Sequence, residues 1–244
     1  MCHKQICQRI AVCFTAFMLC AFSAQAALIS LAPNNSNESV SLADLISGEV
    51  EGVSVGDKTF DEFFYSSIGD MPEAEDVEVF GFMDEVGNFG VSFHGSFIDL
   101  PGDGPSDALL RFTVEVSSEE AERGFRISDA HLFGGGIGVD EDDEDSVFII
   151  DESFQQNDAT MSVFATTLGG PLETKLSDRV DFKKIYTRLR VTKDIFARAS
   201  DESNLPARTT VIDQSFSQVI IPEPATLGLV AFALLGIAVG QREF

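Results

Sequence analysis

The chain has 244 residues, of which 16 are Lys or Arg and 40 are Asp or Glu, so its formal net charge is −24. This charge excludes nucleic acid as a partner, because neutralising phosphates requires an excess of Lys and Arg. A hydrophobic fraction of 44% with 22 Phe excludes a disordered acidic tail, and 20 Gly with eight Pro exclude collagen-like and proline-rich chains.

Residues 1–26 have the three parts of a secretory signal peptide. Two basic residues precede an apolar run from residue 10 to residue 22, and Ala24 and Ala26 then form an Ala-x-Ala site. The apolar run is shorter than the ~20 residues that a membrane span needs. We therefore predict export through the Sec translocon and cleavage by signal peptidase after Ala26.

All four cysteines lie within the first 20 residues. Cleavage after Ala26 would leave a mature chain with no disulfide, no thiolate metal site and no cysteine nucleophile. A lipoprotein signal with Cys20 as the lipidated residue is the alternative interpretation. It is disfavoured because the bulky Leu19 stands where that processing requires a small residue.

The middle of the chain has the alternating pattern of β-strands. Apolar and polar residues alternate with a period of two, and Gly- and Pro-containing turns separate the runs. The predicted strands are 53–60, 77–82, 89–97, 109–116, 125–133, 147–150, 161–167, 185–191 and 209–221. Single helical turns are expected at 61–65 and 118–124, and a polar loop at 198–208.

Eight to ten such strands predict an all-β fold, an antiparallel β-sandwich of jelly-roll-like type. Residues 53–221 are expected to form this acidic domain, with a phenylalanine-rich core between its sheets. The Ser- and Asn-rich residues 27–52 are expected to lead into it. Charge is unevenly distributed, with 32 acidic residues against four basic ones in 27–174 and six against nine in 175–221. We expect the late cations to face the acidic surface of their own domain.

Near the C-terminus, residues 225–240 contain no charged or amide side chain. As a helix they would reach about 24 Å, slightly less than a hydrocarbon core of about 30 Å. Length alone favours a buried core helix. Their place at the end of an exported chain favours a single transmembrane helix, which we predict to begin after the two prolines Pro222 and Pro224.

The motif Pro222-Glu223-Pro224, followed by this apolar segment and Arg242, resembles the PEP-CTERM sorting signal over residues 222–244. The resemblance implies recognition by exosortase, a membrane-embedded enzyme that cuts near the motif. The protein would then lie transiently in the inner membrane before it reaches the cell surface or the extracellular polysaccharide matrix. The family usually ends in a cluster of arginines, whereas here one basic residue stands beside an acidic one.

Six carboxylates in a row at 140–145 are the most conspicuous motif for chemistry. Asp140, Asp142 and Glu144 have the spacing of calcium ligands, because Ca²⁺ takes six to eight oxygens. An EF-hand is excluded, since its glycine position is Asp145 and its bidentate glutamate position is Asp151. A looser Ca²⁺ site and a solvated acidic hairpin loop both remain open, and the loop is the favoured interpretation.

No catalytic constellation is recognisable. The predicted mature chain has two histidines, His94 and His131, and neither stands in a motif with a nucleophile. We expect no enzyme activity and no cofactor other than Ca²⁺. Sugar-binding platforms commonly use Trp or Tyr, and this chain has no Trp and only Tyr65 and Tyr186. The favoured function is therefore an exported matrix protein of unknown ligand, and the alternative is a Ca²⁺-dependent carbohydrate-binding module.

Overall fold

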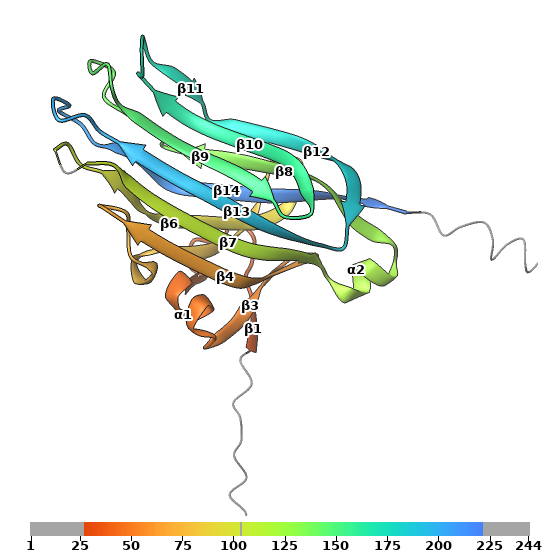
Figure 1. The fold of residues 1–244 in the computed structure, drawn as a ribbon. Helices are drawn as coiled ribbons and strands as arrows, with labels where there is room; N and C mark the ends of the chain where they lie inside the picture. The colour runs from red at the N-terminus through yellow and green to blue at the C-terminus, as the bar shows by residue number, and fades with distance from the viewer. Residues whose placement is uncertain (1–26, 103, 222–244) are drawn as a thin grey trace, which may run out of the picture.

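The computed structural model describes residues 27–102 and 104–221, which form two sheets packed as two layers (Figure 1). The eight-stranded sheet has, in spatial order, β1 (Ala27–Ser30), β3 (Val50–Val55), β4 (Lys58–Ile68), β7 (Ser106–Val116), β13 (Arg188–Arg198), β9 (Val147–Phe154), β10 (Asn157–Thr166) and β11 (Glu173–Lys175). The six-stranded sheet has β12 (Ser177–Tyr186), β8 (Phe125–Gly135), β14 (Ala207–Ile220), β6 (Phe89–Asp99), β5 (Glu78–Met83) and β2 (Ser39–Ser41). Three short helices accompany them, α1 (Leu42–Ser47), η1 (Ala74–Asp76) and α2 (Ser118–Glu122).

The all-β class and the antiparallel sheets are confirmed. Within the described residues, strand pairing is antiparallel except between β1 and β3, which run parallel. The finer prediction, a sandwich of jelly-roll-like type, stays a prediction. The two sheets have 14 strands, whereas a jelly roll has about eight. The helical turn expected at 118–124 is present as α2, and the polar loop expected at 198–208 joins β13 to β14.

A cluster of phenylalanine rings holds the two sheets together, as the sequence predicted. Phe60 and Phe112 come from the eight-stranded sheet, and Phe93 and Phe216 come from the six-stranded sheet. All four side chains are fully buried. The ring centroids of Phe93 and Phe112 are 5.6 Å apart, and those of Phe60 and Phe216 are 6.3 Å apart. Such tilted contacts add to the free energy gained from burying the rings.

Residues 27–52, expected only to lead into the domain, are part of both sheets. β1, α1 and the start of β3 lie in this range, and β2 pairs with β5 at the edge of the six-stranded sheet. Leu31, Val40, Leu42 and Leu45 are buried in the core. The Ser- and Asn-rich composition reflects the turn at 33–38, because the apolar residues on either side of that turn fold inward.

The prediction of a helical turn at 61–65 is wrong, because these residues continue strand β4. Pairing with β7 shifts between Asp61 and Phe64, and Glu62 has a φ of 54°, in the left-handed region. This bulge adds a residue to one strand, so Phe60 and Phe63 both point inward although they are three residues apart. Two apolar residues three positions apart are typical of a helix, and here the bulge produces that spacing.

The strand expected at 185–191 is divided between the two sheets. β12 ends at Tyr186 in one sheet and β13 begins at Arg188 in the other. Five of the nine late cations pair with carboxylates of their own domain, as expected, namely Lys175, Arg179, Arg188, Arg190 and Lys193. Arg188 lies 3.0 Å from a carboxylate oxygen of Asp61 and 2.7 Å from one of Glu115.

Candidate functional site

The outward face of the six-stranded sheet brings polar and aromatic side chains into rows. Cross-strand pairing aligns one row across β5, β6, β14, β8 and β12, namely Phe82, Gly90, Ser215, His131 and Arg179. The adjacent row on the same face is Phe80, Ser92, Asp213, Phe133 and Ser177. Residues two positions apart on a strand share one face, so the two rows form a continuous surface. We call this surface the outer face.

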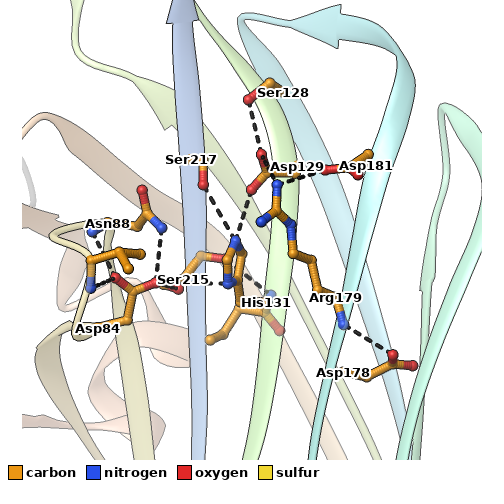
Figure 2. A network of polar contacts seen from close by, with 12 residues as sticks. Asp84, Asn88, Ser128, Asp129, His131, Asp178, Arg179, Asp181, Ser215 and Ser217 are labelled. Atoms are coloured by element: carbon orange, nitrogen blue, oxygen red, sulfur yellow. Dashed lines mark hydrogen bonds and ion pairs between the residues drawn. The ribbon is translucent and has the colours of Figure 1, made fainter.

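His131 lies at the centre of a polar network on the outer face (Figure 2). Its Nε2 atom is 2.9 Å from Asp129 Oδ1 and 3.3 Å from the hydroxyl of Ser217. Its Nδ1 atom is 3.8 Å from Asp84 Oδ2. Arg179 reaches the same network from β12, with a nitrogen 3.4 Å from Asp129 and 2.7 Å from Asp181. The imidazole therefore lies between two carboxylates, that of Asp129 on its own strand β8 and that of Asp84 in the turn after β5.

Asp84 closes the tight turn at the end of β5. Its carboxylate accepts hydrogen bonds from the backbone N–H groups of Val86 and Asn88, at 3.1 and 2.9 Å, and from the Asn88 side chain at 2.9 Å. The Ser215 hydroxyl donates a further bond of 2.7 Å. Burial by itself would raise the pKa of Asp84, but these donors outweigh it and hold the pKa below its ordinary value. The turn is thereby fixed to the centre of the sheet.

A second cluster joins Ser92, His94 and Asp213 beside the first. The Ser92 hydroxyl donates to Asp213, and His94 Nε2 lies 2.8 Å from the same hydroxyl. Burial lowers the pKa of His94 and raises that of Asp213. The serine lies between the acid and the histidine, whereas in a nucleophilic triad the histidine lies between serine and acid. The cluster thus provides hydrogen-bond donors and acceptors rather than the contact order of a triad.

Two hollows lie over these clusters, and Phe82 and Asp213 line both of them. The hollow beside His131 has a volume of about 440 Å³, and the one beside His94 about 300 Å³. We call the two together the outer-face groove. The rings of Phe82 and Phe133 meet edge to face, with centroids 6.2 Å apart. The ring centroids of Phe80 and His94 are 4.4 Å apart.

The N-terminal segment supplies one wall of the groove. Asn34, Asn35 and Ser36 line the hollow beside His94. Asn34 exchanges two hydrogen bonds with the backbone of Met83, one of 3.0 Å and one of 3.1 Å. Its φ of 58° is a left-handed conformation that asparagine tolerates better than most residues. A segment expected to precede the domain therefore contributes to its candidate site.

The predicted calcium ligands do not converge. Asp140 is buried, and its carboxylate accepts bonds from the Asn204 N–H at 2.8 Å and the Asp142 N–H at 3.2 Å. These backbone donors hold the pKa of Asp140 below its ordinary value. Asp142 and Glu144 are exposed. Among residues 27–102 and 104–221, no group of three or more His, Cys, Asp or Glu side chains is placed to hold a metal ion.

The acidic run forms one wall of a separate cavity of about 770 Å³, which the loop of residues 198–204 also lines. Asp143 accepts a bond of 2.8 Å from Ser200 and another from Ser146. Hydrogen bonds within the domain therefore hold this loop in place.

The remaining predicted sites lie outside the described residues. These are the cleavage site at Ala24 and Ala26, the motif Pro222-Glu223-Pro224 and the helix at 225–240. Within the part of the chain that the structure describes, no helix is long and apolar enough to cross a membrane.

Sequence reasoning missed the outward-facing aromatic residues. Phe80 and Phe82 alternate with the buried Val79 and so share a face with Glu78, which is the face directed to solvent. Phe133 likewise shares a face with His131. The alternation alone indicates this outward face, but phenylalanine in a strand is more often buried, so the sequence predicts a core position for these rings.

Comparisons with known proteins show no family for this chain. No protein-family model matches it, and no curated protein does. Among solved structures, it is similar to the enzymatically active domain of tailspike protein 4 from bacteriophage CBA120, with 10% identity and a TM-score of 0.27. The match covers 65% of this chain and 19% of the tailspike chain, and at this TM-score it carries no argument. The class that the structure defines is an all-β protein with antiparallel sheets.

Proposed function

We propose that the chain is an exported surface or matrix protein whose β-sandwich binds a neutral glycan in the outer-face groove. One observation carries the glycan part of the proposal. The half-buried Phe82 ring lies between two hollows whose polar lining includes Asp84, His131 and Asp213. Sugars present apolar C–H faces and a ring of hydroxyls, so they suit a site where aromatic rings adjoin donors and acceptors.

Charge favours a neutral ligand over an acidic one. The groove is lined by Asp84, Glu85 and Asp213, against Arg179 and His131. The chain as a whole has a net charge of −24, which repels polyanions at low ionic strength. Calcium has no part in this proposal, because the carboxylates of Asp140 and Asp143 are already engaged by backbone and hydroxyl donors.

The test is binding of the purified protein to immobilised polysaccharides. We expect retention on a neutral set of agarose, dextran and cellulose that exceeds retention on alginate. Phe82→Ala should weaken binding by about fivefold or more, because a stacked ring contributes on the order of 1 kcal/mol. Phe64→Ala is the matched control, since Phe64 is an exposed ring on the other sheet, stacked on Arg111. Equal binding by Phe82→Ala and wild type would refute the glycan site.

The sorting part of the proposal rests on the PEP-CTERM resemblance at Pro222-Glu223-Pro224. The folded domain extends to the residue before this motif, since the Ile221 N–H donates a 2.9 Å bond to the Gly124 carbonyl. Replacing the three motif residues by alanine should leave the protein unprocessed in the inner membrane. The measurement is the intact mass and location of the protein in cells with and without exosortase. An alanine variant that reaches the surface at wild-type size would contradict the sorting proposal and leave the glycan site untouched.

A further inference from the structure

Three polar side chains meet in the centre of the core, between the two sheets. They are Lys193 on β13, Glu152 on β9 and Gln214 on β14, and none is more than 1% exposed. Lys193 and Glu152 are direct cross-strand partners in the eight-stranded sheet. Gln214 reaches them from the six-stranded sheet. The Lys193 Nζ atom contacts both Glu152 Oε2 and the carboxamide oxygen of Gln214.

Three cross-strand neighbours of Lys193 and Gln214 are apolar, and the nearest further charges are those of Asp178 and Asp213. Lys193 pairs across the strands with Leu110, and Gln214 pairs with Val91 and Leu132, all three fully buried. Removing charged groups from water in such a place costs more than an apolar replacement would. The triad therefore calls for a role other than stability.

Burial sets the protonation of the pair toward its neutral forms. It lowers the pKa of Lys193 and raises the pKa of Glu152, and the attraction between the two groups opposes both changes. A neutral amine is a nucleophile, whereas an ammonium ion is not. A neutral carboxylic acid can donate a proton to a carbonyl oxygen.

Glu152 also has an unsatisfied atom. Its Oε1 is buried and has no hydrogen-bond partner. Buried polar oxygens are rarely left without a donor. This second carboxyl oxygen is therefore free to exchange a proton while Oε2 faces the amine.

We propose that Lys193 and Gln214 form an intramolecular isopeptide bond, with Glu152 as the general acid and base. The Lys193 nitrogen attacks the carboxamide carbon of Gln214, and Glu152 protonates the carbonyl oxygen. Glu152 then takes a proton from the attacking nitrogen and delivers it to the amide nitrogen. The original C–N bond breaks and one ammonia leaves. As the carbonyl re-forms, its oxygen returns the first proton to Glu152, which is restored to its starting form. One amine and one primary amide thus give one secondary amide and ammonia, with no oxidant or cofactor.

Such a bond would do what a disulfide does in other exported domains. The chain has no cysteine after residue 20, so no disulfide can join its sheets. An amide between β13 and β14 would join the two sheets covalently at their centre. The inference does not depend on the glycan site.

The test is the mass of the purified full chain and its tryptic peptides. We expect the folded protein to be about 17 Da lighter than the same processed polypeptide, the mass of one ammonia. Tryptic digestion should yield one branched species that joins residues 191–198 to the peptide beginning at Thr209. A wild-type protein with the unmodified mass and three separate peptides, 191–193, 194–198 and the one beginning at Thr209, would overturn the proposal and identify the triad as a buried ion pair.

Variants identify the reacting groups. Lys193→Arg removes the nucleophile and Glu152→Gln removes the acid while keeping its size, so both should show the full mass and no branched peptide. Lys183→Arg, at an exposed lysine of β12, should keep the mass deficit. A deficit that persists in Lys193→Arg would place the ammonia loss elsewhere and overturn the proposal. The wild-type measurement decides the matter even if a core variant fails to fold.

Discussion

Replacing Asp84 by alanine tests whether the outer face depends on the turn that this residue fixes. Asp84 accepts four hydrogen bonds, of which only the one from the Ser215 hydroxyl comes from a fully buried donor. Leaving that hydroxyl without an acceptor costs about 1–3 kcal/mol. The donors of Val86 and Asn88 lie nearer to water, which can replace the carboxylate at roughly 0.5 kcal/mol each. With three such donors, we expect a loss of about 2.5–4.5 kcal/mol in the free energy of unfolding.

Urea unfolding followed by circular dichroism measures this loss, and Asp181→Ala is the control. Asp181 belongs to the same polar network through Arg179, but its side chain is 77% exposed, so its loss should stay within about 0.5 kcal/mol. In Asp84→Ala/Ser215→Ala both buried partners are absent, and the double variant should lose less than the sum of the two single variants. Additive losses, or a loss below about 1 kcal/mol for Asp84→Ala, would refute the reasoning.

Three further outcomes follow from the structure. Phe112→Ala should cost about 3–5 kcal/mol in urea unfolding, because it opens a cavity among buried rings, whereas Phe64→Ala at the surface should cost far less. Hydrogen bonds from Arg190 and Thr113 lower the pKa of Glu62 from 4.5 to about 2, so its stabilisation is present above pH 4.5 and is lost as pH falls toward 2. Above pH 4.5 the free energy of unfolding of wild type should exceed that of Glu62→Gln by no more than about 1 kcal/mol, because Glu62 is nearly half exposed. The matching difference in melting temperature should shrink as the pH falls toward 2. Millimolar Ca²⁺ should shift the melting temperature by less than about 1 °C, and a larger rise would contradict our account of the acidic loop.

The sequence predicted the class of fold because alternation and turn residues are local properties. Strand β7 and the strand around Phe93 carry their period of two without interruption, and the structure contains both. The bulge at Glu62 could not be predicted, because its extra residue produces the spacing of a helix. The passage of the chain from one sheet to the other at Thr187 could not be predicted either. Ile185 continues the alternation of β13, although it lies on β12 in the other sheet.

The candidate site was harder to predict because it depends on which strands become neighbours. His94 and His131 are 37 positions apart in the sequence, and both reach the outer-face groove only because β14 pairs with β6 on one side and β8 on the other. The Ca²⁺ alternative depends on the path of a loop in the same way. The spacing of Asp140, Asp142 and Glu144 does not specify where each carboxylate points, and in the structure Asp140 accepts a hydrogen bond from the backbone of residue 204.

Strand β14 links the proposed glycan site to the proposed cross-link. Its inward Gln214 is one member of the core triad, and its outward neighbours Asp213 and Ser215 belong to the two polar clusters of the outer face. A covalent bond at Gln214 would fix β14 against β13 and so hold those two side chains in register with β6 and β8. The bond would already have reduced the conformational freedom of β14, so less conformational entropy would be lost when a glycan binds. Preorganisation raises affinity in this way. We therefore expect Lys193→Arg, where it folds, to bind neutral polysaccharide more weakly than Lys183→Arg, although neither residue lines the outer-face groove.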